Sequence, residues 1–145
     1  MILWRGGPCR KSSRTGQSLC LAVKFHLATA PGLNLFTAYG DGFVSVNGVS
    51  YRSSVVVLPE RMVDPWEVTA FDTLSSSHFE FLSSLGVEVV LLGTGARLRF
   101  PPPALQRIVV ASGTGLETMD AAAACRTYNI LATEGRKVAA AILLD

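Results

Sequence analysis

The residues best suited to binding chemistry form a glycine-containing loop followed by two arginines. Gly93, Thr94 and Gly95 come directly after an aliphatic run, and Arg97 and Arg99 follow at alternating positions. Exposed backbone N–H groups and guanidinium groups suit a carboxylate or a phosphate. The loop is therefore a candidate site for a small anion or a nucleotide. The alternative is a tight turn whose arginines are solvated or paired with acids.

Arg126 is the third arginine of this candidate site, on a helix predicted after Asp120. It would point toward the Gly93 loop if both lie at one edge of a sheet; otherwise it bonds a helix or loop carbonyl, or Glu134. The loop lacks the Gly-Lys-Ser/Thr of a phosphate-binding loop, and the third glycine and immediate helix of a dinucleotide fingerprint. A second Gly-Thr-Gly, at residues 113–115, precedes a predicted strand, so we expect it to have a different role.

The other chemically active side chains match no catalytic or metal-binding pattern. His26 and His78 belong to no motif that would make either of them a base. Cys9, Cys20 and Cys125 lack the spacing of a zinc site, and Cys125 lies on an apolar helix face, where a packed thiol is expected. We therefore predict no catalytic residues, no metal and no cofactor.

Pro65 and Trp66 are candidates for a contact surface. A tryptophan in this loop is expected to anchor the core beneath it, and an exposed indole would indicate a surface for a protein partner.

Length and composition indicate one domain. The chain has 145 residues, of which 49% are hydrophobic and 17% charged. No apolar run approaches the roughly 18 to 20 residues that span a bilayer, and an odd number of cysteines suits a reducing compartment. We therefore expect a soluble protein of the cytoplasm.

Residues 1–24 differ from the rest of the chain and are expected to be disordered. They hold five basic side chains and no acid, whereas residues 25–145, the predicted domain, hold eight basic and eleven acidic ones, a formal charge of −3. Three interpretations of the segment stay open: a basic arm for a polyanionic partner, a targeting segment, and a stretch outside the native protein. The mildly acidic domain argues against nucleic-acid binding.

The first half of the domain has an antiparallel β pattern. Strands are predicted over Leu35–Tyr39, Phe43–Val46 and Val49–Tyr51, and Asn47-Gly48 between the last two is a strong hairpin signal because both residues tolerate positive φ. A further strand over Val55–Leu58 ends at Pro59.

The second half alternates strands and helices. Ser77 and Glu80 fit a capping box for a short helix that ends at Gly86, and Asp120 caps a later helix that ends at Gly135. Another helix begins at the prolines of residues 101–103 and ends at Gly113. Strands are predicted at 87–92, 116–119 and 138–144. The order favours right-handed crossovers between parallel strands. The predicted fold is α/β with three layers: a mixed central sheet with a βαβαβ C-terminal half, and an N-terminal antiparallel β-hairpin extension.

From Lys24 onward the chain resembles a small family of bacterial and archaeal proteins of unknown function that also contains the mitochondrial complex I assembly factor 3. Ordered motifs across the whole domain carry the likeness: Tyr39-Gly-Asp-Gly-Phe-Val, Val46-Asn-Gly-Val, Val57-Leu-Pro, Pro65-Trp66, Leu91-Leu-Gly-Thr-Gly-Ala-Arg, Arg99-Phe-Pro, Glu117, Met119-Asp, Ala123-Ala-Cys-Arg-Thr-Tyr-Asn-Ile-Leu and Glu134-Gly-Arg. The resemblance implies a three-layer α/β fold with a mixed central sheet and a hairpin extension, and no established enzymatic activity.

The resemblance also implies an accessory or assembly protein that acts through contacts with an unidentified protein partner, at the Trp66 loop or at a sheet edge. The alternative function is binding of a small anion or nucleotide by the Gly93 loop and its arginines. Bacterial-type members of the family begin near Lys24. Val23 is therefore a candidate for the true first residue, encoded by a GUG start codon that was read as an internal valine codon, and residues 1–22 would then be absent from the native protein. Mass spectrometry of the natively expressed protein tests this hypothesis, which any peptide from residues 1–22 contradicts.

Overall fold

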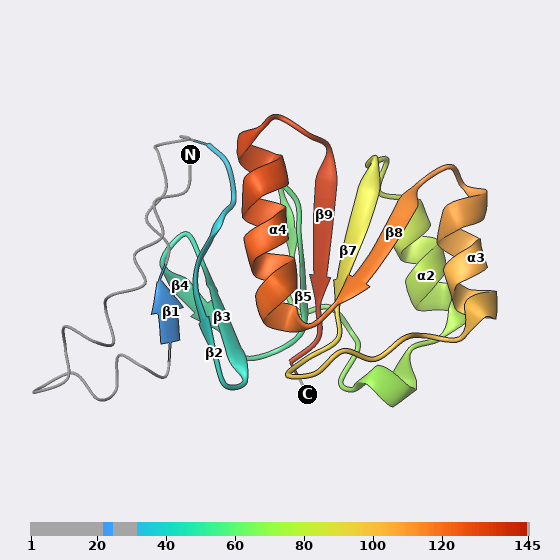
Figure 1. The fold of residues 1–145 in the computed structure, drawn as a ribbon, viewed down its shortest axis with the longest axis horizontal. Helices are drawn as coiled ribbons and strands as arrows, with labels where there is room; N and C mark the ends of the chain where they lie inside the picture. Colours follow the sequence, from blue (N-terminus) through green and yellow to red (C-terminus); the bar gives the residue numbers. More distant parts are fainter. Residues whose placement is uncertain (1–21, 25–31, 145) are drawn as a thin grey trace, which may run out of the picture.

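A computed structural model describes residues 22–24 and 32–144, which form two β-sheets with helices packed against the larger one (Figure 1). The smaller sheet is antiparallel, in the order β1 (Ala22–Lys24), β2 (Phe36–Gly40), β3 (Phe43–Val46) and β4 (Val49–Tyr51). The larger sheet has the order β6 (Met62–Val63), β5 (Val55–Val57), β9 (Val138–Ile142), β7 (Val89–Gly93) and β8 (Gly115–Met119). The helices are the 3₁₀ helix η2 (Phe71–Thr73), α2 (Ser76–Ser83), α3 (Pro103–Ala111) and α4 (Ala121–Thr133).

The predicted hairpin is confirmed. Asn47 and Gly48 both have positive φ, 52° and 86°, and Val46 pairs with Val49 across the turn. The Asn47 side chain also accepts a hydrogen bond from the Leu35 amide at 3.2 Å, so the turn is tied to the residue that precedes β2.

The basic N-terminal segment falls largely outside the described residues. The structure does not describe residues 1–21 of the segment, nor His26, which follows it. The proposed absence of residues 1–22 therefore stays a prediction. Residues 22–24 form β1, which pairs with β2 so that Ala22 lies opposite Gly40. The predicted disorder is therefore wrong for these three residues, because the outer edge of β2 offers backbone donors and acceptors that pair with them.

The larger sheet is mixed, as predicted. β7 runs parallel to both β8 and β9, through crossovers that contain α3 and α4, while β5 is antiparallel to β9. The sequence analysis missed β6, a strand of two residues that pairs with β5. Such a length is too short for a periodic signal.

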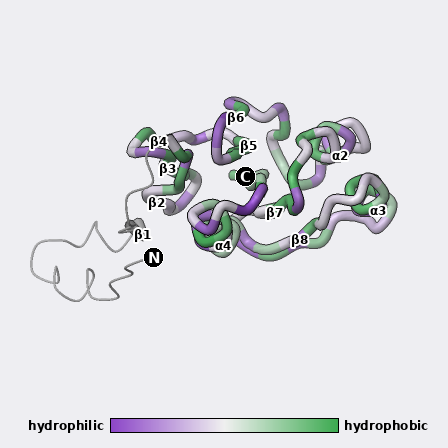
Figure 2. The backbone as a smooth tube through the Cα atoms, turned by 90° about the horizontal axis from the view of Figure 1, so that it is seen from above, coloured by the Kyte–Doolittle hydropathy of each residue, from purple (hydrophilic) through white to green (hydrophobic). Residues whose placement is uncertain are grey.

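The larger sheet is buried on both faces, which gives the predicted three layers. Along β9, Val138, Ala140 and Ile142 pack toward α4 and the smaller sheet, while Ala139 and Ala141 pack toward α2 and α3. Figure 2 shows the larger sheet between these two groups of elements. This arrangement explains why the strand is apolar without alternation.

The N-cap of α2 differs from the prediction. Ser75, with extended backbone, is the N-cap, and its amide donates to Nδ1 of His78 at 3.1 Å. The capping box thus uses Ser75 and His78, and the predicted pair of Ser77 and Glu80 is wrong. Three consecutive serines can each cap a helix, and the imidazole three residues after Ser75 selects the first.

Asn129 joins the smaller sheet to α4. Its Oδ1 accepts from the Phe36 amide at 2.9 Å and its Nδ2 donates to the Phe36 carbonyl at 2.8 Å. The side chain is fully buried, although the sequence places it among the polar residues of the helix. None of the helices in the described ranges is long and apolar enough to cross a membrane.

Candidate functional site

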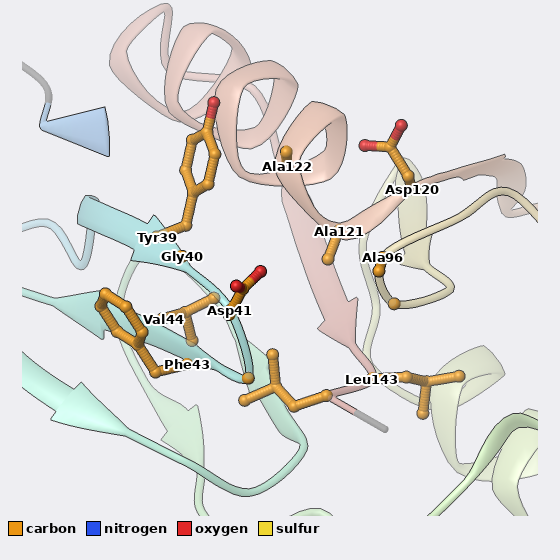
Figure 3. A pocket seen from close by; sticks show the side chains of 13 residues that line it. Tyr39, Gly40, Asp41, Phe43, Val44, Ala96, Asp120, Ala121, Ala122 and Leu143 are labelled. Atoms are coloured by element: carbon orange, nitrogen blue, oxygen red, sulfur yellow. The ribbon is translucent and has the colours of Figure 1, made fainter. Parts of the chain in front are cut away.

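A pocket of about 330 Å³ lies at the carboxyl edge of the parallel strands (Figure 3). It is bounded by the turn between β2 and β3, the first turn of α4, the loop after β7 and the segment after β9. Ligands bind open α/β sheets at this edge. Its lining residues are Tyr39, Gly40, Asp41, Gly42, Phe43, Val44, Gly95, Ala96, Asp120, Ala121, Ala122, Leu143 and Leu144.

The charged side chains of this lining are both acidic. Figure 3 shows the carboxylates of Asp41 and Asp120 at the pocket. Oδ1 of Asp120 accepts from the Ala123 amide at 2.8 Å, which confirms Asp120 as the cap of α4. The negative charge compensates the positive end of the helix and disfavours a phosphate or carboxylate in the pocket. Its chemistry suits a neutral or cationic group.

Gly93, the first residue of the candidate loop, is needed for close packing. A Cβ at Gly93 would lie 2.9 Å from Cδ1 of Ile142, 3.1 Å from Cα of Ala121 and 3.1 Å from Cβ of Ala124. The missing side chain therefore lets α4 approach β7 and β9. Gly93 is a packing residue, and of the tripeptide only Gly95 lines the pocket.

Thr94 and Arg99 fasten the loop to itself. The fully buried Thr94 hydroxyl donates to the Arg97 carbonyl at 2.7 Å and accepts from the Arg99 amide at 3.0 Å. The Arg99 guanidinium donates to the Thr94 carbonyl at 2.6 Å and lies 4.7 Å from the centre of the Phe71 ring. Arg99 therefore has a structural role in this loop.

The structure does not bring the three candidate arginines together. Arg97 is exposed, Arg99 stacks on Phe71, and Arg126 donates to the Tyr39 hydroxyl at 2.8 Å. Arg126 thus has a partner that neither sequence alternative named. None of the three lines the pocket, so anion binding there stays a prediction that the geometry does not favour.

The fastened loop presents two apolar side chains to solvent. Leu98 is 49% exposed and Phe100 is 66% exposed. The sequence analysis missed both as candidates. The signal that would have found them is a pair of large apolar residues in a loop that ends in three prolines, where no helix or strand pattern assigns them to the core.

Trp66 is 5% exposed and packs into the core on the side of α2, with its ring 6.0 Å from that of His78. The core-anchor alternative is therefore confirmed for the indole. The preceding Pro65 is exposed, and two depressions of about 480 and 370 Å³ flank the pair. Pro65 with the rim of Trp66 stays a predicted contact surface.

Cys125 is a packed thiol, as expected. It is fully buried, and burial raises the pKa of the thiol well above its usual range, so the reactive thiolate is disfavoured. Within the described parts of the chain, no group of three His, Cys, Asp or Glu residues is arranged to hold a metal ion.

The chain resembles known proteins in both sequence and structure. A family described as "Protein of unknown function (DUF498/DUF598)" matches residues 36–143. A crystal structure of a Bordetella parapertussis protein superimposes with a TM-score of 0.74 at 42% identity, over 81% of this chain and 100% of that one. An uncharacterised Rhodobacter capsulatus protein is 37% identical over 107 residues, 72% of this chain and 80% of that protein.

A relative with a functional name comes from Bos taurus. It is called NADH dehydrogenase [ubiquinone] 1 alpha subcomplex assembly factor 3, and it is 33% identical over 104 residues. The match covers 70% of this chain and 55% of the bovine protein. The chain therefore matches little more than half of that relative.

Proposed function

The chain belongs to the DUF498/DUF598 family, which includes NADH dehydrogenase assembly factors, and from that premise we propose that it promotes assembly of a multisubunit complex through protein–protein contact. A membrane-bound NADH dehydrogenase is the complex that the relatives' name suggests. The family resemblance drawn from the sequence is thereby confirmed, while the role of this chain is our proposal.

The observation that supports contact as the mode of action is the fastened loop with Leu98 and Phe100. Aromatic side chains that enter a pocket on a partner often dominate the affinity of an interface. A segment that is already held in place has less conformational entropy to lose on binding. The three hydrogen bonds between Thr94 and residues 97 and 99 supply that order. We propose that Phe100 inserts into an apolar pocket of the partner.

The chemistry of the loop agrees better with this function than with anion binding. Arg99 donates to a backbone carbonyl within its own loop and covers Phe71, so its cationic group stabilises the loop. The neighbouring pocket carries two carboxylates. Both features leave the apolar side chains as the part of this region suited to recognition.

The experiment measures complex assembly in cells of the source organism that lack the gene. We expect less assembled NADH dehydrogenase on native gels and slower NADH oxidation by membranes, both restored by the wild-type chain. Phe100→Asp should fail to restore them, because the loss of an aromatic anchor costs about 2 kcal/mol or more, roughly a 30-fold loss of affinity.

Val110→Asp is the matched control. Val110 is 57% exposed on α3, outside the loop, so the change adds the same charge to a similarly exposed position. It should restore assembly fully, and both variants should unfold at the same denaturant concentration as the wild type. Normal assembly in the deletion strain would contradict the proposed function; equal restoration by the two variants would contradict the role of the loop.

A further inference from the structure

Strand β8 forms an open edge of the larger sheet. It has five residues and pairs only with β7 among the described strands, whereas the strand at the opposite edge, β6, has two. β8 contains no proline, and its pairing with β7 has no register shift. A regular edge of this length is a template for an additional strand.

In β8, the backbone N–H and C=O groups of two residues point away from β7. The Gly115 amide donates to the Glu88 carbonyl at 2.9 Å, and the Met119 carbonyl accepts from the Thr94 amide at 2.9 Å, so both ends of β8 bond toward β7. Because backbone groups alternate in direction along a strand, Leu116 and Thr118 turn their N–H and C=O groups away from β7. Two donors and two acceptors therefore lie along the outer edge.

The side chains along this edge set the chemistry of an added strand. Glu117 is exposed and lies on the α4 face of the sheet, since it pairs with Leu91. Leu116 lies on the other face, half-buried in the cluster that contains α3. An added strand would meet one carboxylate at its centre and an apolar or β-branched side chain on either side.

We propose that the β8 edge binds an extended segment of a protein partner as an antiparallel sixth strand, with a lysine or arginine opposite Glu117 and apolar residues beside it. The inference rests on the proposed function, because it adds a second contact, besides the Phe100 loop, by which the chain would recognise a partner. Main-chain hydrogen bonds supply affinity in this mode, and alternate side chains supply specificity.

The edge is poorly suited to a second copy of the chain. In a two-fold antiparallel pair centred on β8, Glu117 would face Glu117 of the other copy. Because Leu116 and Thr118 carry the outward hydrogen bonds, this would be a non-hydrogen-bonded pair, in which side chains are closest and like charges repel. A basic residue at the same place gains the attraction instead.

The test uses the full chain labelled with ¹⁵N and a blocked peptide, Ser-Thr-Val-Lys-Val-Thr-Ser, as the probe. We expect amide shifts in β8 and at least fivefold slower hydrogen exchange at Leu116 and Thr118 at saturating peptide. Unchanged β8 amides at millimolar peptide, or shifts confined to another surface, would overturn the proposal. So would a dimer through β8 in the absence of peptide.

Two controls separate strand addition from other binding. N-methylation of the peptide amides that face β8 should abolish binding, whereas N-methylation of the other amides should leave it unchanged. Thr118→Pro removes one outward N–H of β8 and should weaken binding at least tenfold, while Thr118→Val retains that N–H and should bind like the wild type. The methylated peptides decide the question even if Thr118→Pro does not fold.

A charge swap tests the role of Glu117. Glu117→Lys should weaken the lysine peptide about fivefold, and a peptide with glutamate at its centre should regain that factor with this variant. Equal affinities in all four combinations would overturn the predicted basic residue.

The outcomes also separate this inference from the proposed function. Peptide binding with normal complex assembly in the deletion strain would leave the edge as a contact site and contradict the assembly role. Defective assembly without peptide binding would support the assembly role and contradict the β8 edge as a contact site.

Discussion

The two Gly-Thr-Gly tripeptides have the same sequence and lie at opposite edges of the larger sheet. Residues 93–95 begin with the last residue of β7, at the carboxyl end of the parallel strands, and residues 113–115 end with the first residue of β8, at the amino end. At the first, Gly93 lies in a strand, and a Cβ there would meet three side-chain or backbone atoms within 3.1 Å. At the second, Gly113 has a φ of +89° and nothing within 4 Å of an added Cβ.

The threonines differ in the same way. Thr94 is fully buried and makes hydrogen bonds of 2.7 and 3.0 Å within its loop. Thr114 is 7% exposed and its hydroxyl contacts are longer, 3.3 Å to Ser112 and 3.4 Å to the Val87 carbonyl. The comparison shows that the surrounding elements give a short glycine motif its role: close packing and loop order at one edge, helix termination at the other.

Alanine substitution of Gly93 should produce the largest difference between the two tripeptides. Gly93→Ala forces Ile142 or the start of α4 to move, so we expect a loss of about 3 kcal/mol in the free energy of unfolding. Gly115→Ala is the control, since its nearest atom would be 3.5 Å away, an ordinary contact. Urea denaturation measures both. A loss of similar size in the two variants would contradict the packing role of Gly93.

The second prediction compares the threonines. Thr94→Val removes the hydroxyl that satisfies the Arg97 carbonyl and the Arg99 amide, and we expect a loss of about 2 kcal/mol. Faster amide exchange should be confined to residues 96–100. Thr114→Val should cost less than half as much, because the hydrogen bonds that it removes are long. Equal losses, or unchanged exchange in the first loop, would show that Thr94 does not order this loop.

The sequence predicted four of the five strands of the larger sheet and the three α-helices packed against it, because each has a periodic or block pattern of its own, whereas the two residues of β6 have none. Asn47-Gly48, Asp120 and the aliphatic run of β9 are local signals whose meaning does not depend on distant residues. The predicted N-cap of α2 was wrong for a local reason: three adjacent serines are equally good N-caps, and the choice among them depends on His78.

The candidate site was harder to predict because its side chains are directed by tertiary contacts. Arg126 lies on the expected helix, yet its partner is Tyr39, 87 positions earlier in the chain. The sequence gives Asn129 the polar character of a surface residue, but in the fold its side chain is buried against the smaller sheet. Spacing placed the Gly93 loop at the correct edge of the sheet but could not show that Arg99 would turn back onto Phe71.

The third prediction concerns the conformational role of Gly113. Alanine at this position must adopt a left-handed backbone, so Gly113→Ala should lower the free energy of unfolding by about 1 kcal/mol, although there is space for the side chain. Gly113→Asn should lose less, because asparagine tolerates this conformation better than alanine. If the two substitutions lower the free energy of unfolding equally, backbone conformation is not the cause. Gly113 would then not be required for its positive φ, and its contrast with Gly93 would no longer hold.

The smallest effect is expected at the ion pair beside the second tripeptide. Nε of Arg136 donates to Oε1 of Glu88 at 2.9 Å, and both side chains are more than half exposed. This hydrogen bond, together with the positive charge of Arg136, lowers the pKa of Glu88 from its ordinary value of 4.5.

A lowered folded-state pKa means that the pair stabilises the fold above the unfolded-state pKa and loses this contribution as the pH falls through the folded-state value. Glu88→Gln should therefore reduce stability slightly at pH 7, near the limit of measurement, and the difference from the wild type should shrink as the pH falls through the folded-state pKa, which lies below 4.5. It should also vanish in 1 M NaCl, which screens exposed charges. Denaturant melts of the two proteins at pH 7 and pH 3 provide the comparison. A loss larger than that of Gly113→Ala would mean that the amino end of the strands depends on its charges more than on its backbone, and a loss independent of pH would mean that the charge of Glu88 is not the cause.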